Sequence, residues 1–498
     1  MTTRRLLPLH EITQADRPFV GGKAAGLAEL IHAGVPVPPG FVITALATHN
    51  PRAPMPEPLR DELISQLNGG PDQRYAVRSS AAHEDGATRS YAGHYATFLN
   101  VLPEDVPAAV SRCWASLTAV EGAYEATSDR IAVVVQQMAR PESSGVAFSA
   151  VSRSDGTQAM GIEAVYGLGE ALVSGLLTPQ RFTLSRKNGQ LLGQTLTRQP
   201  LMLHPGVDGP ERLYGDTVPF RNHTLQVIRE QRGSRTLAVT LPPDLATSRC
   251  LPLEALGALH HALIAAEQHF RQPVDAEWVW TGAALLLVQT RPVTAPVAWP
   301  DHLSEPGHTD HLTGDLHGDR QGLGAAPGQA SGPARRLEPG DTGDTLQAGE
   351  VLLAHQTFPK WFFAMRRAAA IVTETGGMLS HAAIVARELG VPCVAGVNDL
   401  PDWPDGTVLH VNADAGTVSS DPPEEVPAEA PEPAEVDWHT RSINPAAALF
   451  ETLEASLRRP DAPIPGLFSV SLADPGVPLS PEEHRWLHAA RQLSRPPS

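Results

Sequence analysis

The stretch TETGGMLSHAAIVARELGVPCVAG, from Thr373 to Gly396, decides the fold. Its two glycines, Gly376 and Gly377, allow the backbone to approach a phosphate without a Cβ in the way. Ser380 is a good helix N-cap, which places His381 at a helix N-terminus. Unpaired N–H groups and the helix macrodipole stabilise an added anion there. This arrangement is typical of a histidine that carries a phosphoryl group.

A buried histidine that only caps a core helix is the competing interpretation. The apolar run after His381 predicts a helix through Leu389, with Gly390 as its C′ residue and Pro392 preventing extension. A lone histidine in such a run is usually structural. The glycine pair, the serine and the helix start together favour the phosphoryl-carrier interpretation.

The same stretch resembles the phosphohistidine domain of the phosphoenolpyruvate-utilising enzymes. That family includes phosphoenolpyruvate synthase (pyruvate, water dikinase), pyruvate phosphate dikinase and rifampin phosphotransferase. The resemblance begins upstream, at Gly324–Gly328 and Leu346–Leu353, and closes at Asp414–Gly416. It implies that His381 is transiently phosphorylated.

A phosphoryl donor site is expected in the first three hundred residues, but the familiar phosphate-binding loops are missing. Residues 21–26, GGKAAG, lack the upstream glycine of a Walker A loop and the Ser or Thr after its lysine. Residues 167–170, GLGE, lack the third glycine of a dinucleotide fingerprint. Five separated segments instead resemble the ATP-grasp nucleotide-binding domain of the same family.

Candidate phosphate contacts lie in the first of these segments. Lys23 is one, ahead of a helix predicted over residues 24–33. Arg78 is another, because a guanidinium can bind two phosphate oxygens, and the resemblance makes it the family's phosphate-binding arginine. Ala92 and Gly93 belong to a small-residue loop that is expected to fold over the phosphates and exclude water.

Adenine contacts are expected from the hinge at Gln137 and Met138. They follow a strand predicted over residues 131–135, for which an ordinary core strand is an equal alternative. Residues 144–148 are predicted to form the strand paired with it. Glu170 either bonds the ribose or caps a turn.

The most specific nucleotide segment is a pair of strands, DAEWVW from Asp275 and QTRP from Gln289. A connection near residues 281–282 would bring Glu277 and Gln289 together as oxygen ligands for Mg²⁺. Asp275 shares the face of Glu277, and Arg291 shares the face of Gln289, where it would add positive charge near the transferred group. Acidic pairs on strands are usually solvated, but the two motifs together favour a nucleotide site.

Composition excludes several other classes of protein. The chain has 498 residues, 42% of them hydrophobic, which is enough for two to four cores. A net charge of -17 without a basic run argues against nucleic-acid binding, and no apolar run is long enough for a membrane span or signal peptide, so we expect a cytoplasmic protein. Cys113, Cys250 and Cys393 are predicted core thiols.

The predicted organisation is an α/β and α+β multidomain chain. An ATP-grasp domain over residues 1–294 is followed by a flexible linker over 295–321 and a swivelling β/α phosphohistidine domain over 322–420. The linker is rich in His and Asp, and metal binding is the weaker interpretation of it. Fully extended, it could span up to about 80 Å, enough for the swing that characterises the family. Residues 421–498 form an acidic, proline-rich segment and a short helical tail.

The resemblance does not reach an acceptor domain. Dikinases continue into a barrel that binds pyruvate or phosphoenolpyruvate, and rifampin phosphotransferase carries a large inserted acceptor domain. Residues 422–498 are too few and too polar for a barrel of about 250 residues, and the linker leaves no room for an insert. The acceptor site is therefore expected on a partner polypeptide or on the tail, or is absent from a degenerate enzyme.

The resemblance thus predicts an ATP- and Mg²⁺-dependent phosphotransferase with paired acceptors, similar to phosphoenolpyruvate synthase. The β-phosphoryl group of ATP would pass through phospho-His381 to a small molecule, pyruvate or a hydroxylated compound, giving AMP and phosphate. A rifampin-type phosphotransferase and a non-catalytic phosphohistidine regulatory or carrier protein are the alternatives.

Overall fold

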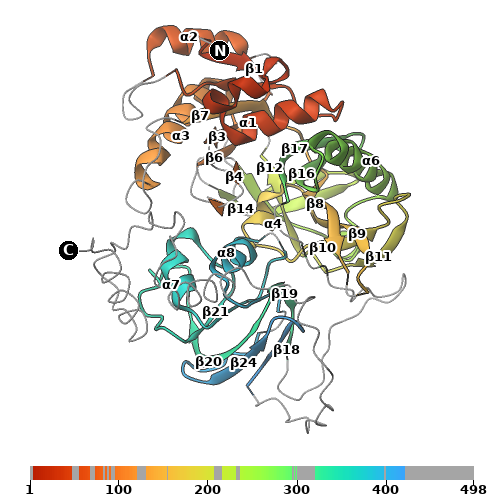
Figure 1. The fold of residues 1–498 in the computed structure, drawn as a ribbon, viewed down its shortest axis with the longest axis vertical. Helices are drawn as coiled ribbons and strands as arrows, with labels where there is room; N and C mark the ends of the chain where they lie inside the picture. The colour runs from red at the N-terminus through yellow and green to blue at the C-terminus, as the bar shows by residue number, and fades with distance from the viewer. Residues whose placement is uncertain are drawn as a thin grey trace, which may run out of the picture. The chain divides into compact units, whose positions relative to one another are not determined.

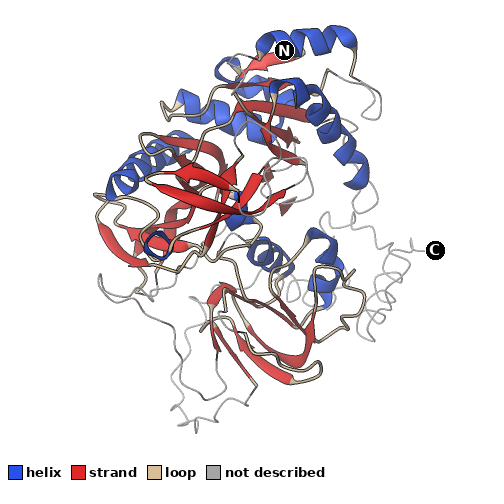
Figure 2. Ribbon diagram, turned by 180° about the vertical axis from the view of Figure 1, so that it is seen from behind, coloured by secondary structure: helices blue, strands red, loops and turns tan. Residues whose placement is uncertain are grey.

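The computed structural model describes residues 4–420, with gaps at 48–54, 68–72, 82–84, 87–88, 91–95, 121–130, 154, 207–215, 232–235, 294–296, 298, 300–319, 379 and 398–399. For residues 85–86, 89–90, 117–120 and 229–231 it describes the backbone alone. Ala92, Gly93 and the predicted tail lie outside the described residues. The fold is mixed α/β, as predicted, and Figures 1 and 2 show its helices and strands.

The first sheet is antiparallel and is covered by helices on both faces. Its strands, in spatial order, are β1 (Leu6–Pro8), β2 (Gly40–Ile43), β7 (Ala132–Gln137), β3 (Tyr75–Ser80) and β6 (Thr97–Val101). The helices around it, red to orange in Figure 1, are α1 (Arg17–His32), α2 (Glu57–Gln66) and α3 (Val106–Val120).

The central strand β7 explains why this sheet forms. Val133 and Val135 pack in the core that holds Trp114 of α3, whereas Val134 faces the core that holds Leu27 of α1. Successive side chains of a strand point to opposite faces, so an unbroken β-branched run fits a strand buried on both sides. The strand predicted over residues 131–135 is confirmed.

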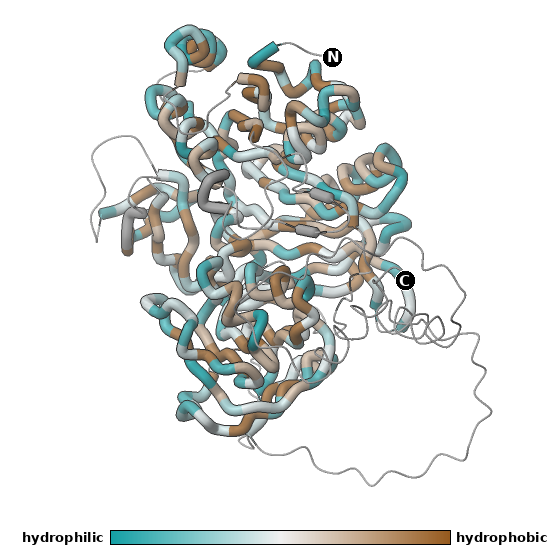
Figure 3. Tube along the Cα trace, turned by 60° about the vertical axis from the view of Figure 1, so that its left-hand side comes forward, coloured by the Kyte–Doolittle hydropathy of each residue, from teal (hydrophilic) through white to brown (hydrophobic). Residues whose placement is uncertain are grey.

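The second sheet is also antiparallel and packs against the long helix α6 (Leu253–Phe270). Its strands, in spatial order, are β11 (Leu191–Thr195), β10 (Gln180–Leu184), β9 (Gln158–Tyr166), β8 (Ser143–Ser152), β16 (Val274–Trp280) and β17 (Leu285–Pro292). Figure 3 shows hydrophobic and hydrophilic positions alternating along surface helices, as amphipathic packing requires.

Smaller elements complete this part of the chain. A third sheet has the order β12 (Leu201–Pro205), β15 (Thr236–Thr240), β14 (His223–Gln231) and β13 (Thr217–Phe220), and a hairpin pairs β4 (Asp85–Gly86) with β5 (Arg89–Ser90). Two short helices are α4 (Glu170–Val173) and α5 (Pro243–Ala246).

One sequence prediction in this region is confirmed and one needs correction. Non-helical Gly21 (φ 78°) divides α1 into two helical segments, and the second segment corresponds to the helix predicted over residues 24–33. The strand predicted to pair with β7 lies in the other sheet, since β8 pairs with β9 and β16. The hinge after β7 therefore carries the chain from one sheet to the next.

The predicted linker starts later than residue 295. Trp299 is buried, donates its backbone N–H to Ser152 O at 2.8 Å, and donates Nε1–H to Thr183 Oγ1 at 2.8 Å. Val297 O accepts from Ser152 N at 2.8 Å. These bonds attach the beginning of the predicted linker to β8 and β10, which shortens the segment left to span between domains.

The remaining described residues form a mixed sheet with its own helices. Its strands, in spatial order, are β18 (Arg320–Gln321), β25 (Thr417–Ser419), β24 (Val408–Asn412), β20 (Gln329–Arg336), β21 (Val351–Ala354), β22 (Ala370–Thr373), β23 (Cys393–Ala395) and β19 (Leu323–Ala326). The steps from β20 through β23 are parallel. The helices are α7 (Phe362–Arg367) and α8 (His381–Leu389).

All three cysteines are buried, as predicted. Among the described residues, no helix is both long and apolar enough to cross a membrane.

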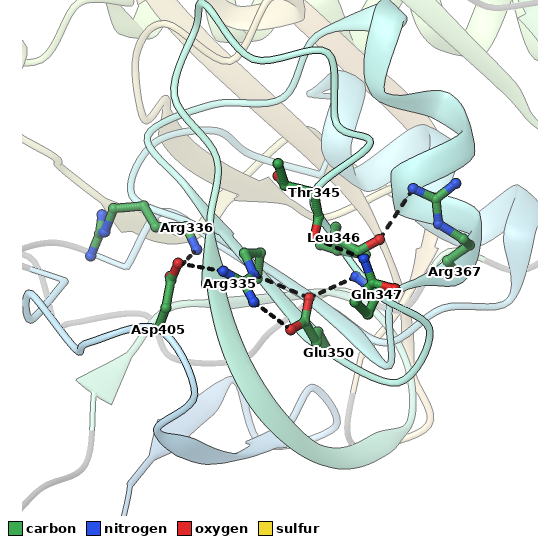
Figure 4. Close-up of polar contacts among 8 residues, drawn as sticks. All are labelled: Arg335, Arg336, Thr345, Leu346, Gln347, Glu350, Arg367 and Asp405. Atoms are coloured by element: carbon green, nitrogen blue, oxygen red, sulfur yellow. Dashed lines mark hydrogen bonds and ion pairs between the residues drawn. The ribbon is translucent and has the colours of Figure 1, made fainter.

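A charged cluster lies at the connection between the parallel strands β20 and β21. Arg335 donates to both carboxylate oxygens of Glu350, at 2.9 and 3.2 Å, and to Asp405 at 2.7 Å (Figure 4). Glu350 also accepts from the backbone N–H of Gln347 at 2.7 Å. The hydrogen bonds from Arg335 are the main reason why the pKa of Glu350 lies below its usual range.

We expect Glu350→Gln to lower the free energy of unfolding at pH 7 by about 1–2 kcal/mol, because a charge-assisted bidentate pair is lost. Since the pKa of Glu350 is lower in the folded state, its contribution is full above the unfolded pKa of about 4.3 and falls as the pH drops through the folded value. Urea unfolding at pH 7 and pH 4 should therefore show a difference that shrinks in acid. Exposed Glu338→Gln is the matched control, and an equal loss at both pH values would contradict the assignment.

Candidate active site

The motifs DAEWVW and QTRP form a hairpin. Strands β16 and β17 pair antiparallel, and Gly282 (φ 88°) lies in the connection between them. Glu277 stands opposite Gln289, and Asp275 opposite Arg291. The predicted pairing and shared face are therefore present, with the four side chains in two neighbouring rows.

Arg78 reaches this hairpin from β3 of the first sheet. Its Nη2 donates to Glu277 Oε2 and to Gln289 Oε1, both at 2.9 Å, and its Nη1 donates to Val288 O at 2.9 Å. The Arg78 side chain is only 12% exposed, against 30% for Glu277. A single guanidinium thus neutralises the carboxylate and joins two sheets.

One atom of Arg78 remains to be explained. Its Nε is buried without a hydrogen-bond acceptor among the described residues. A buried donor without an acceptor is costly, and a guanidinium is well suited to anionic phosphate oxygens. The donor set at this position therefore fits a phosphate group beside the carboxylate and amide oxygens of Glu277 and Gln289, which are ligand types that Mg²⁺ accepts.

Two further cations lie near Arg78 and Glu277. Lys23 is buried in α1, and its Nζ donates to Ser79 O at 3.2 Å. Ser79 directly follows Arg78 in the chain. Arg291 Nε donates to both oxygens of Asp275, at 2.8 and 3.1 Å. Lys23, Arg78 and Arg291 are therefore gathered from three separate segments around one hairpin.

The predicted adenine hinge lies at the end of β7. Gln137 is the last residue of that strand, and the backbone N–H of Met138 donates to Arg74 O at 2.8 Å. Asn100 N–H lies 3.1 Å from Met138 Sδ. Glu170 is the first residue of α4, and Gly169 is the N-cap of that helix.

His381 is the first residue of α8, as predicted. Ser380 Oγ is the N-cap and accepts from Ala383 N at 3.4 Å, and Gly390 (φ 67°) ends the helix. The ring is oriented by Thr357, whose Oγ1 lies 2.8 Å from His381 Nδ1. When Nδ1–H donates to this hydroxyl, the lone pair resides on Nε2.

Sequence reasoning missed Thr357 and Glu163. Thr357 lies in a loop without a distinguishing pattern. Glu163 does stand out in the sequence, because it is a lone carboxylate inside the mostly apolar strand β9. In the structure its side chain is fully buried. Its Oε1 accepts from the backbone N–H of Met378 at 2.9 Å, which joins β9 to the loop that precedes His381.

Glu163 and Glu277 lie on the same face of the second sheet. Glu163 stands opposite Val146 of β8, and Val146 stands opposite Glu277 of β16. Two strand spacings separate the two carboxylates in this row, or about 10 Å. The loop before His381 is therefore attached to the sheet face that carries the candidate metal ligands.

Comparison with known families agrees with this architecture. The model of the pyruvate phosphate dikinase, AMP/ATP-binding domain matches residues 49–302, just over half of the chain. The model of the PEP-utilising enzyme, mobile domain matches residues 346–416.

Individual relatives share the same region. The probable phosphoenolpyruvate synthase of Methanothermobacter thermautotrophicus is 31% identical over 461 residues, covering 82% of this chain and 62% of that protein. The phosphoenolpyruvate synthase of Aeropyrum pernix is 32% identical over 480 residues, covering 84% of this chain and 58% of that protein. The chain thus spans about three-fifths of the length of these relatives. It belongs to the family defined by the pyruvate phosphate dikinase AMP/ATP-binding domain, and a PEP-utilising mobile domain follows that domain.

Proposed function

We propose that this chain transfers a phosphoryl group from ATP to His381 and then to an acceptor, as a dikinase-type phosphotransferase. The observation that carries this proposal is the convergence of Arg78, Glu277 and Gln289 on the sheet face to which the His381 loop is attached. Donor ligands and carrier histidine come from distant parts of the chain, so their common location favours a shared reaction.

Each group has a distinct task in this proposal. Glu277 and Gln289 would hold Mg²⁺, which neutralises charge on phosphate oxygens when bound. Arg78, Lys23 and Arg291 would bind the phosphates, and Gln137 and Met138 would meet the base. Asp275 orients Arg291 through its two hydrogen bonds.

Thr357 sets up the attacking atom. With Nδ1–H bonded to the threonine hydroxyl, Nε2 of His381 attacks phosphorus, and an N–P bond forms as the P–O bond to AMP breaks. The remaining phosphate leaves by hydrolysis, so ATP and water give phosphohistidine, AMP and inorganic phosphate. The helix N-terminus stabilises the charge gained by the histidine.

Pyruvate is the proposed acceptor, because the relatives that match most of the chain are named phosphoenolpyruvate synthases. A hydroxylated small molecule is the alternative. In either case we propose that a separate acceptor-domain protein can supply the acceptor site.

Incubation with Mg-ATP should add one phosphoryl group to the wild-type protein and release AMP, whereas His381→Ala should gain none. Intact-protein mass spectrometry at neutral to alkaline pH, with nucleotide chromatography in parallel, measures both. An equal label on the mutant would place the phosphoryl group elsewhere. No label and no AMP from the wild type would favour the carrier or regulatory alternative.

Glu277→Gln should raise the Mg-ATP concentration needed for half-maximal labelling by at least about tenfold, because one hard anionic ligand is lost while the side-chain shape is kept. Rapid-quench labelling across Mg-ATP concentrations measures this change. Glu267→Gln is the matched control, since Glu267 also pairs with an arginine, Arg186. Equal effects in the two variants would reject the metal-ligand role.

Thr357→Val should slow labelling of His381 by about 10- to 100-fold without weakening ATP binding, because the imidazole loses the partner that selects its tautomer. Thr357→Ser keeps the hydroxyl and should restore most of the rate. Single-turnover labelling across pH tests this, and unchanged rates in the valine variant would exclude Thr357 as a positioning residue.

A further inference from the structure

We propose that Glu163 is a positioning residue that docks the His381 loop on the nucleotide-binding domain, and that Gly377 is glycine because of this contact. The inference rests on the proposed function, since the docked loop is the one that would receive the phosphoryl group. Three groups of contacts support it.

The first is the hydrogen bond between Glu163 and Met378. A fully buried carboxylate needs strong donors to offset its lost hydration. Glu163 obtains one of these from a backbone N–H of the other domain, at 2.9 Å. Cations also lie near it: Arg181 stands opposite Glu163 on β10, and Arg387 of α8 donates to Met378 O at 2.5 Å. Both arginines interact electrostatically with the Glu163 carboxylate.

The second is the space available at Gly377. A Cβ placed there would lie 2.6 and 2.8 Å from the carboxylate oxygens of Glu163, and 2.6 Å from Pro179 Cγ. Gly377 does not have a positive φ, so its own loop does not require glycine. Gly376 differs: its φ is 119°, and its Cβ would meet Ser380 Oγ at 2.9 Å within the loop. Of the two glycines, Gly377 is therefore the one whose need for glycine comes from the contact between the domains.

The third is the packing around the hydrogen bond. The Met378 side chain is buried in an apolar cluster with Val146, Leu172 and Leu177 of the nucleotide-binding domain. Thr375 Oγ1 donates to Gly175 O. A flexible methionine and a few hydrogen bonds make a modest contact, which suits a carrier that must leave again.

A disulfide can report this contact without any chemistry on ATP. A Cβ at Gly175 would lie 3.9 Å from Gln356 Cβ, within the usual range of about 3.5–4.5 Å for a disulfide. Gly175 has φ 75°, so a cysteine there adds backbone strain, and this strain is the same in all the variants whose closure rates are compared. The native cysteines are buried, so Gly175→Cys with Gln356→Cys introduces the reactive pair. Under mild oxidation of the full chain we expect this pair to close.

Glu163→Ala, added to the cysteine pair, should slow disulfide closure by at least about tenfold. Glu163→Gln should retain much of the rate, because its amide oxygen can still accept from Met378 N. In the chain without the cysteines, Glu163→Ala should slow His381 labelling while ATP binding measured by calorimetry is unchanged. Closure rates unaffected by both Glu163 variants would overturn the proposal.

Gly377→Ala provides a second test, in which the Glu163 side chain itself is kept. It should slow both closure and labelling with little change in the thermal midpoint, because the clash exists only in the docked arrangement. Gly340→Ala is the matched control, since a Cβ at Gly340 meets nothing within 4 Å. Equal closure rates in the two alanine variants would overturn the proposal.

The two readouts separate the docking contact from the proposed function. Closure that depends on Glu163, in a protein that Mg-ATP does not label, would support the contact and reject the phosphotransfer. Labelling with closure independent of Glu163 and Gly377 would support the phosphotransfer and reject the contact.

Discussion

The ion pair between Arg78 and Glu277 is the interaction on which the nucleotide-binding part depends. It links β3 of the first sheet to β16 of the second, and its two partners are 199 residues apart in the chain. A partly buried carboxylate and a mostly buried guanidinium are each unfavourable alone, but together they offset much of each other's desolvation. This pairing sets the distance between the two sheets at the place where phosphates are proposed to bind.

Much of this arrangement could be predicted from sequence because it depends on local patterns. The alternation of DAEWVW and QTRP predicts a hairpin and the opposition of Glu277 and Gln289, which the structure contains. Ser380 and Gly390 predict the limits of α8 by capping chemistry alone. In these cases the relevant contacts lie within a few residues, or within two neighbouring strands, so short-range geometry is sufficient.

The parts that sequence did not predict are long-range. The bond from Arg78 to Glu277, the orientation of His381 by Thr357 and the contact of Glu163 with Met378 join residues from 24 to 215 positions apart. No periodicity encodes such pairs. The wrong partner for β8 has the same origin, since adjacency in sequence suggested a hairpin where the chain instead crosses between sheets.

The glycine pair before His381 shows how one motif can combine two physical constraints. Gly376 is required by its own backbone, with φ 119°, so the constraint acts even in the isolated domain. Gly377 has an ordinary backbone and is constrained by a carboxylate 214 positions earlier in the chain. In sequence the two residues are indistinguishable. A carrier domain that must leave its donor site needs contacts that are lost when it departs. A glycine that is required only in the docked arrangement adds specificity to that arrangement without stabilising the undocked one.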